Sequence, residues 1–490
     1  MKQPLRFLVV SGLAILALTG CTVGPDFHPP ATPNVGAYTA SALPGKTVHA
    51  PVPGGDSQTF AFGRDISAEW WQLFRSPELD ALVRKGLEDN PSLQAAQAAL
   101  QVAEENLRAA GGALIYPQVD GSLQAARQRA SAAATSGHPD VFNLYNASVQ
   151  VSYTLDLFGS TRRQLEALKA QVDYQQYQVE ATYLTLAGNI VTTAIQEASL
   201  RSQIAATHDI LAAERQQLAM VKRQFELGAV PKASVLSQQS QLAITSATLP
   251  PLEKQLAVTR HALAALVGEM PAAAKLPSFE LATLHLPQEL PVSLPSALAR
   301  QRPDIRAAEA LLHQAGANVG VATANLYPKI TLSGSFGTEA NRTGDLFTGP
   351  SSIWSLGAGL LQPIFHGGEL KAKQRAAVAS YHEAAAQYRQ TLLTAFQNVA
   401  DVLRALETDA RALDAQSAAA TAVKATLDLT QRQFDLGAVS YLSLLVAQRD
   451  YQQTRIGLIT AQAQRYADTA ALFQSLGGGW WNTAEAQQAK

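Results

Sequence analysis

The eight residues Arg223-Gln-Phe-Glu-Leu-Gly-Ala-Val230 return later in the chain as Arg432-Gln-Phe-Asp-Leu-Gly-Ala-Val439, with seven of the eight positions identical. Three further landmarks recur in the same order: Asn90-Pro as Arg302-Pro, Tyr116-Pro as Tyr327-Pro, and Leu157-Phe as Ile364-Phe. All the offsets lie between 207 and 212 residues. Because a solenoid unit repeats after only about 20 to 50 residues, this period indicates the duplication of a half-domain.

The octapeptide closes a long helical stretch in each half. Residues 160–227 contain no proline and a single glycine, and residues 369–436 contain neither. Each stretch predicts a helix of roughly 100 Å at 1.5 Å per residue. Apolar residues in the second stretch are spaced alternately by four and three: Leu392, Phe396, Val399, Leu403 and Leu406. This heptad spacing predicts side chains packed in a coiled coil or a barrel of helices, with no chemical role.

Each half also contains two short stretches in which apolar and polar residues alternate. We expect strands over about 118–128, 147–157, 329–337 and 353–363. In the second of them, Val149, Val151 and Tyr153 alternate with Gln150, Ser152 and Thr154. This length and alternation are typical of transmembrane β-strands, although the half-buried strands of a soluble sheet alternate in the same way.

Shorter helical stretches return from the octapeptide towards the strands. They pair as Pro231–Gly268 with Pro295–Leu326, and as Pro77–Leu114 with Tyr441–Leu476. Stacked end to end, the two stretches of each pair are together about as long as one outgoing helix. Gly228 and Gly437 fall between outgoing and returning helices, where glycine permits a tight turn with positive φ. We therefore expect both turns to lie about 100 Å from the strands.

Four strands per chain cannot close a membrane barrel, which needs at least eight. Open sheet edges are not tolerated in lipid, so a chain that spans the membrane in this way must oligomerise around an axis. The pattern alone leaves two, three or four copies open. The predicted fold class is mainly α with a small β part, built from duplicated half-domains.

The N-terminus has the pattern of an export signal. Lys2 and Arg6 precede the apolar run 7–18, which is too short to span a bilayer. The run ends in Leu18-Thr-Gly-Cys21, and Cys21 is the single cysteine of the chain. This resembles the bacterial lipobox, so we expect Cys21 to carry a covalent lipid as the first mature residue. Thr22, where Asp would favour retention in the inner membrane, predicts the outer membrane.

The composition argues against nucleic-acid binding and catalysis. The chain carries 38 Lys and Arg against 39 Asp and Glu, so no basic surface is indicated. Its nine histidines show no metal-site spacing. The sequence contains neither a nucleophile motif nor a phosphate loop. We expect no enzyme activity, no metal and no cofactor apart from the lipid on Cys21.

The chain resembles the TolC superfamily, in the lipoprotein branch of outer-membrane factors (OprM/NodT type) that serve resistance–nodulation–division efflux pumps. The duplicated octapeptide is the most diagnostic motif, beside Cys21-Thr-Val-Gly-Pro-Asp-Phe, Trp70-Trp-Gln-Leu-Phe, Arg302-Pro-Asp-Ile-Arg and Leu326-Tyr-Pro-Lys-Ile. The resemblance implies a homotrimer that completes a β-barrel in the outer membrane, with an α-helical barrel and an equatorial belt in the periplasm. It implies the exit duct of a tripartite efflux pump.

The resemblance also assigns docking sites and a gate. A periplasmic adaptor would dock at two turns, with the inner-membrane transporter contacted only indirectly. The turn residues are Leu227, Gly228, Ala229, Leu436, Gly437 and Ala438. Many relatives carry an aspartate ring at the periplasmic gate, but here Val446 occupies that position and Ser443 another that is acidic in some relatives. We hypothesise that Leu442 and Val446 instead form an apolar constriction that closes by packing and dewetting.

These patterns give a domain organisation and leave two alternative functions. We expect, in order: signal peptide 1–20; tether and equatorial segment 21–76; first repeat 77–270; proline-rich equatorial linker 271–294; second repeat 295–476; and equatorial tail 477–490. The alternatives are a duct for type I protein secretion and a lipid-anchored coiled-coil scaffold without a pore.

Overall fold

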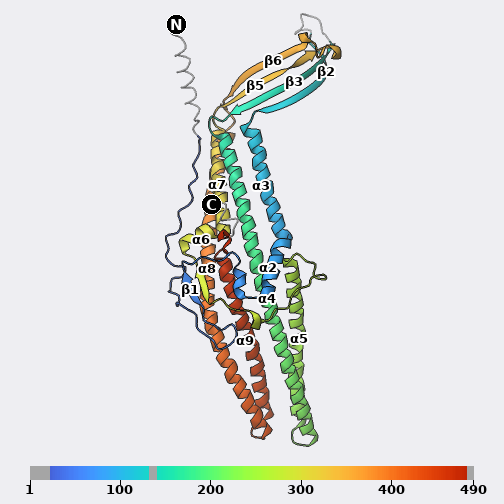
Figure 1. Ribbon diagram of the computed structural model, residues 1–490, viewed down its shortest axis with the longest axis vertical. Helices are drawn as coiled ribbons and strands as arrows, with labels where there is room; N and C mark the ends of the chain where they lie inside the picture. The colour runs from blue at the N-terminus through green and yellow to red at the C-terminus, as the bar shows by residue number, and fades with distance from the viewer. Residues whose placement is uncertain (1–21, 132–140, 483–490) are drawn as a thin grey trace. The chain divides into compact units, whose positions relative to one another are not determined.

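The computed structural model describes residues 22–131 and 141–482 (Figure 1). Most of them are helical. The helices are α2 (Pro77–Asp89), α3 (Pro91–Ile115), α4 (Ser160–Glu226), α5 (Lys232–Leu266), α6 (Pro295–Gln301), α7 (Pro303–Ala324), α8 (Glu369–Asp435) and α9 (Tyr441–Ser475). The strands are β1 (Thr59–Phe62), β2 (Gln118–Arg129), β3 (Val141–Leu155), β4 (Glu289–Val292), β5 (Lys329–Ala340) and β6 (Ser352–Leu361). The predicted mainly helical fold class with a small β part is confirmed.

The duplication is visible in the helix lengths. Helices α4 and α8 contain 67 residues each, and the helices that follow them, α5 and α9, contain 35 each. A helix of 67 residues is about 100 Å long. Helix α5 continues through Pro250 and Pro251, although each proline removes one backbone donor.

The chain divides into two compact units. The strand unit contains the described residues up to 30 together with 98–176 and 307–389. The helical unit contains 31–97, 177–306 and the described residues from 390 onward. Among the described residues, no helix combines the length and the apolar character needed to cross a membrane.

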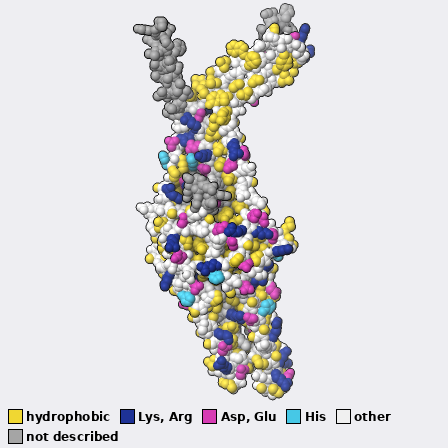
Figure 2. Space-filling model, viewed as in Figure 1, with side chains coloured by type: hydrophobic (Ala, Val, Ile, Leu, Met, Phe, Trp, Pro, Cys, Tyr) yellow, Lys and Arg dark blue, Asp and Glu magenta, His cyan; other side chains and the backbone are white. Residues whose placement is uncertain are grey.

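The strand unit holds an antiparallel sheet with the order β2-β3-β5-β6 (Figure 1). Its register aligns Val149 with Phe336, and Phe336 with Trp354, so large apolar side chains share one face. Serines and threonines line the other face, where Ser335 and Ser355 are hydrogen-bonded at 2.8 Å. Hydrophobic side chains gather over the sheet in Figure 2. The alternation therefore separates an apolar face from a polar one.

Three strands differ in extent from the sequence expectation. Strand β5 continues to Ala340, three residues past the expected end at 337. Strand β3 begins at Val141, six residues before the expected start at 147. The segment Val141-Phe-Asn-Leu-Tyr-Asn146 is rich in strand-forming residues, and it pairs with residues 124–129 of β2. Strand β6 ends at Leu361, two residues before Pro363, which cannot donate to a ladder.

The core of the helical unit joins segments that are distant in the sequence. Strand β1 pairs in parallel with β4, which connects the N-terminal segment to the proline-rich linker. Trp70 lies fully buried and stacks on Phe473 of α9 at 5.3 Å between ring centroids. Near the C-terminus, the Trp481 indole donates to Asp65 at 2.8 Å. The Trp70–Phe473 contact anchors the C-terminal end of α9, whose first turns carry the predicted gate residues.

Candidate docking turns and gate

The two octapeptide turns adopt the same backbone conformation. In the first, the Ala229 N–H donates to the Gln224 carbonyl at 2.8 Å, and Gly228 has a φ of 77°. In the second, the Ala438 N–H donates to the Gln433 carbonyl at 2.8 Å, and Gly437 has a φ of 73°. A bond of this span over a left-handed glycine is the Schellman ending of a helix. The repeated sequence thus builds the same turn twice.

Both turns present apolar side chains to solvent. Leu227 is 70% exposed and Leu436 is 85% exposed. Ala229 and Ala438 are exposed as well. A recess between the turns is lined by residues of both hairpins, including Pro231, Ser234, Phe434 and Leu445. Exposed leucines beside a recess provide a surface suited to an apolar partner.

The three predicted gate residues lie in the first two turns of α9. Ser440 caps this helix, its side chain accepting from the Ser443 N–H at 3.3 Å. Leu442 is 70% exposed and Val446 is 41% exposed. They stand four residues apart, so they lie on one face of the helix. The first turn of α9 contains no acidic residue.

The opposite face of α9 is anchored to the first hairpin. Tyr441 and Leu444 pack with Val221 of α4 and Val235 of α5 in a small buried cluster. Leu444 and Val221 have no exposed surface. One side of α9 is therefore fixed by packing, while Leu442 and Val446 remain free on the other.

A polar network that the sequence analysis missed lies beside this cluster. Its members are Glu214 of α4; Gln238, Gln241 and Thr245 of α5; and Tyr441 and Gln452 of α9. The three α5 residues are spaced by three and four, so they share one face of the helix. In the sequence, the sign of this network is that polar residues, and not apolar ones, occupy the three–four spacing that core positions of a heptad follow.

The lipidation site Cys21 lies outside the described residues, but the segment that follows it is held in the strand unit. Asp26 pairs with Arg163 of α4 at 2.6 Å. Phe27 stacks on His313 of α7 at 4.1 Å between ring centroids. These contacts place the start of the described chain beside the first turn of α4.

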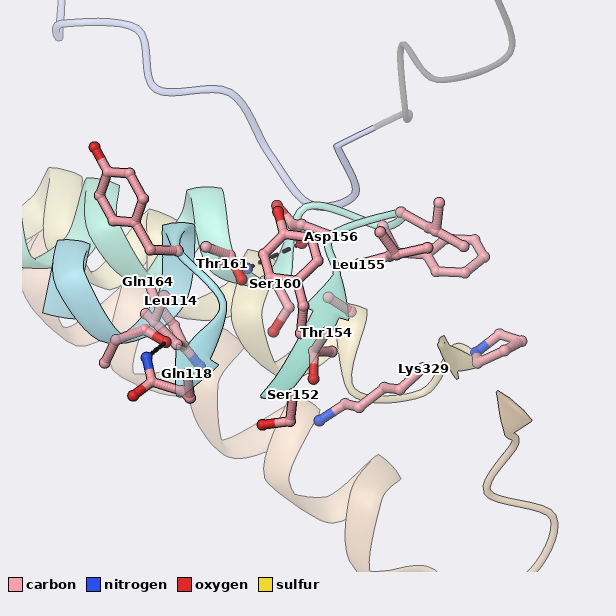
Figure 3. A pocket seen from close by; sticks show the side chains of 17 residues that line it. Leu114, Gln118, Ser152, Thr154, Leu155, Asp156, Ser160, Thr161, Gln164 and Lys329 are labelled. Atoms are coloured by element: carbon pink, nitrogen blue, oxygen red, sulfur yellow. Dashed lines mark hydrogen bonds between the residues drawn. The ribbon is translucent and has the colours of Figure 1, made fainter. Parts of the chain in front are cut away.

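A polar pocket lies where the sheet meets the helices of the strand unit (Figure 3). Its lining includes Ser152 and Thr154 of β3 and Lys329 of β5. Asp156 caps α4 here, accepting from the Thr161 N–H at 3.0 Å and the Arg162 N–H at 3.1 Å. The carboxylate satisfies the free donors of the helix end, so this part of the pocket is structural. No group of three or more His, Cys, Asp or Glu among the described residues could hold a metal ion.

Comparison with known proteins identifies the family. A family model described as outer membrane efflux protein matches residues 82–269 and 294–478. The chain belongs to this family, and the resemblance to TolC-like outer-membrane factors is confirmed. The protein is an outer-membrane exit duct for efflux. The family is one of transport ducts and not of enzymes.

Individual relatives match most of the chain. The pyoverdine export outer membrane protein OpmQ of Pseudomonas aeruginosa is 33% identical over 84% of this chain and 87% of its own length. Outer membrane protein OprJ of the same species is 29% identical over 98% of this chain and 97% of its own.

Solved structures share the fold. The outer-membrane channel OprN is similar with a TM-score of 0.85 and 26% identity, covering 94% of this chain and all of OprN. The open-state MtrE channel of Neisseria gonorrhoeae has a TM-score of 0.79 and 27% identity, covering 94% of this chain and 99% of MtrE.

Proposed function

We propose that three copies of this chain form the exit duct of a tripartite efflux pump. A periplasmic adaptor docks on the two turns, and Cys21 carries a lipid that anchors each copy in the outer membrane. The polar faces of the sheets line the passage, and the apolar faces meet lipid. The unpaired edges of β2 and β6 support assembly, since joining them between copies leaves no open edge in lipid.

The observation that carries the adaptor proposal is the repeated exposed turn. Two Schellman turns display Leu227 and Leu436 outward. A partner with an apolar hairpin tip would bury both leucines, and each fully buried leucine contributes roughly 1.5–3 kcal/mol. Nothing within the described chain covers either side chain enough to bury it.

A double variant tests docking without disturbing either turn. In Leu227→Asp with Leu436→Asp, the adaptor interface would have to bury two carboxylates, which is strongly unfavourable. We expect loss of efflux and of adaptor co-purification, with normal amounts of trimer in the outer membrane. Met270→Asp, at an exposed position just before the proline-rich linker, is the matched control. Undiminished efflux and co-purification in the double variant would remove the docking role.

A deletion strain tests the cargo class. Loss of the gene should lower tolerance to small toxic compounds, and the wild-type gene should restore it. If tolerance to every compound stays unchanged while a secreted protein accumulates inside the cell, the chain serves type I secretion instead. The copy number is read by native mass spectrometry in detergent, where the proposal requires three.

A further inference from the structure

Glu214 is a carboxyl group buried in the wall of the helical unit, near the proposed gate. It is 3% exposed, and its Oε2 atom has no hydrogen-bond partner among the described residues. Its Oε1 atom accepts from Thr245 Oγ1 at 2.9 Å and from Gln241 Nε2 at 3.4 Å. Burial raises the pKa of Glu214, and the hydrogen bonds from Thr245 and Gln241 lower it to a smaller extent.

Thr245 stands between two acceptors on different helices. Its hydroxyl lies 2.9 Å from Glu214 Oε1 on α4 and 3.3 Å from Gln452 Oε1 on α9. A hydroxyl has one proton to donate, so it cannot serve both oxygens at once. If Glu214 carries a proton, Glu214 donates to Thr245 and Thr245 donates to Gln452. If Glu214 is ionised, its carboxylate accepts the hydrogen bond from the Thr245 hydroxyl, and Gln452 Oε1 loses its donor.

A second link runs in parallel through Tyr441. Its hydroxyl donates to Gln238 Oε1, and Gln238 Nε2 donates to the Glu214 backbone carbonyl at 3.2 Å. Burial and the nearby charge of Glu214 raise the pKa of Tyr441, so this donor stays protonated. Tyr441 directly precedes Leu442. The network therefore attaches the start of α9 to the first hairpin.

We propose that Glu214 is a proton-operated latch: its protonated form holds α9, with Leu442 and Val446, against the first hairpin, and its ionised form releases one of the bonds. This inference rests on the proposed gate role of these two residues. The change needs only the transfer of one proton to water and the rotation of one hydroxyl. The latch therefore holds the gate closed more tightly at low pH than at high pH.

Other charged groups around Glu214 are already paired. A recess lined by Glu214 also contains Asp209 of α4, Lys424, Asp428 and Asp435 of α8, and Arg455 of α9. Arg455 pairs with Asp209 at 2.7 Å, and Lys424 pairs with Asp428 at 2.5 Å. Asp435 accepts from Gln431 at 3.0 Å. The residues that α5 contributes to the network, Gln238, Gln241 and Thr245, are uncharged. Glu214 is the buried carboxyl of this set.

The test is single-channel conductance of the full-length protein in planar bilayers between about pH 5 and pH 9. Wild type should leak more as pH rises, by about fivefold, which corresponds to the loss of one hydrogen bond. Glu214→Gln is isosteric and permanently neutral, and its amide can still donate to Thr245. It should stay closed across the whole range. Glu253→Gln, exposed on α5, should keep the wild-type pH profile.

A second variant tests the route of the effect. Thr245→Val keeps the shape of the side chain but removes the hydroxyl, so it should leak about equally at low and high pH. The latch is overturned if Glu214→Gln retains the wild-type pH profile, or if Thr245→Val still closes at low pH. Efflux by the wild-type gene at neutral pH is measured separately. Absence of efflux would count against the proposed duct. Normal efflux, together with a Glu214→Gln variant that keeps the wild-type pH profile of conductance, would count against the latch alone.

Discussion

Glu197 accepts a hydrogen bond from the Arg260 guanidinium at 2.7 Å, at a place where the carboxylate side chain has no exposed surface. Arg201 donates to the same oxygen at 2.6 Å, and the Phe279 N–H donates to the other at 3.0 Å. Arg260 also donates to the carbonyls of Leu276 and Pro277. One buried carboxylate thus ties α4 and α5 to the proline-rich linker.

Removing this carboxylate should be costly. Glu197→Ala leaves the Arg260 and Arg201 charges and the Phe279 N–H without their partner, and we expect the free energy of unfolding to fall by about 3–5 kcal/mol. Chemical unfolding of the detergent-solubilised protein measures the change. Glu253→Ala, at an exposed position of α5, should change stability by less than about 0.5 kcal/mol. Equal effects of the two variants would contradict the structural role of the network.

Alanine substitution should destabilise the protein at the two turn glycines and stabilise it at a glycine within a helix. Gly228→Ala and Gly437→Ala each force a side chain into positive φ, which costs about 1–2 kcal/mol. Gly111→Ala, within α3 and with open space around the added methyl group, should instead stabilise by about 0.5–1 kcal/mol. Thermal melting compares the three. Tolerance of alanine at both turns would show that the left-handed conformation is not required.

The gate hypothesis predicts a specific effect of a new charge. Val446→Asp introduces a carboxylate beside Leu442 in each copy, so a constriction closed by dewetting should rehydrate. We expect higher conductance in the closed state and a new sensitivity to block by multivalent cations. Leu429→Asp, at an exposed position of α8, is the control. If closed-state conductance and cation block stay as in wild type, position 446 does not line the constriction.

Asp468 should give the helical unit a pH-dependent stability. Burial, assisted by the hydrogen bond with Asp409, raises the pKa of Asp468 to about 7. An unfolded aspartate titrates near 3.9, so between these two pKa values the folded protein holds up to one more proton than the unfolded protein. The contribution of Asp468 to the free energy of unfolding should therefore be highest below about pH 3.9 and fall as pH rises towards 7. Asp468→Asn should remove this decline. Unfolding midpoints measured from pH 4 to 8 test it, and parallel curves for the two proteins would refute it.

Loss of the lipid anchor separates a duct from a scaffold. Cys21→Ala abolishes lipidation if the lipobox prediction is correct. The duct requires detergent even then, because the apolar faces of β2, β3, β5 and β6 still need lipid. Sedimentation of the variant with and without detergent measures this. A monodisperse, detergent-free rod would favour the coiled-coil scaffold.

The sequence by itself determined the duplication, the four strands, the lengths of the two long helices and the turn positions. These features are local: helix continuity follows from the absence of proline and glycine, strand faces from a period of two, and each turn from one glycine in an octapeptide. The expected helices over 77–114 and 295–326 are each broken before a proline, at Asn90 and Arg302. The early start of β3 escaped prediction because its first residues are stabilised by pairing with β2 and not by alternation.

Only the tertiary structure decided which polar residues are buried together. Glu214 and Gln452 are separated by more than 200 residues, yet both contact Thr245. Glu197 likewise meets Arg260 and Phe279 through long-range packing. A polar side chain on a helix looks the same in the sequence whether it faces water or a neighbouring helix. The distinction arises when α4, α5 and α9 pack. A buried polar group without a hydrogen-bond partner, or a buried charge without a counter-charge, then lowers the stability of the fold.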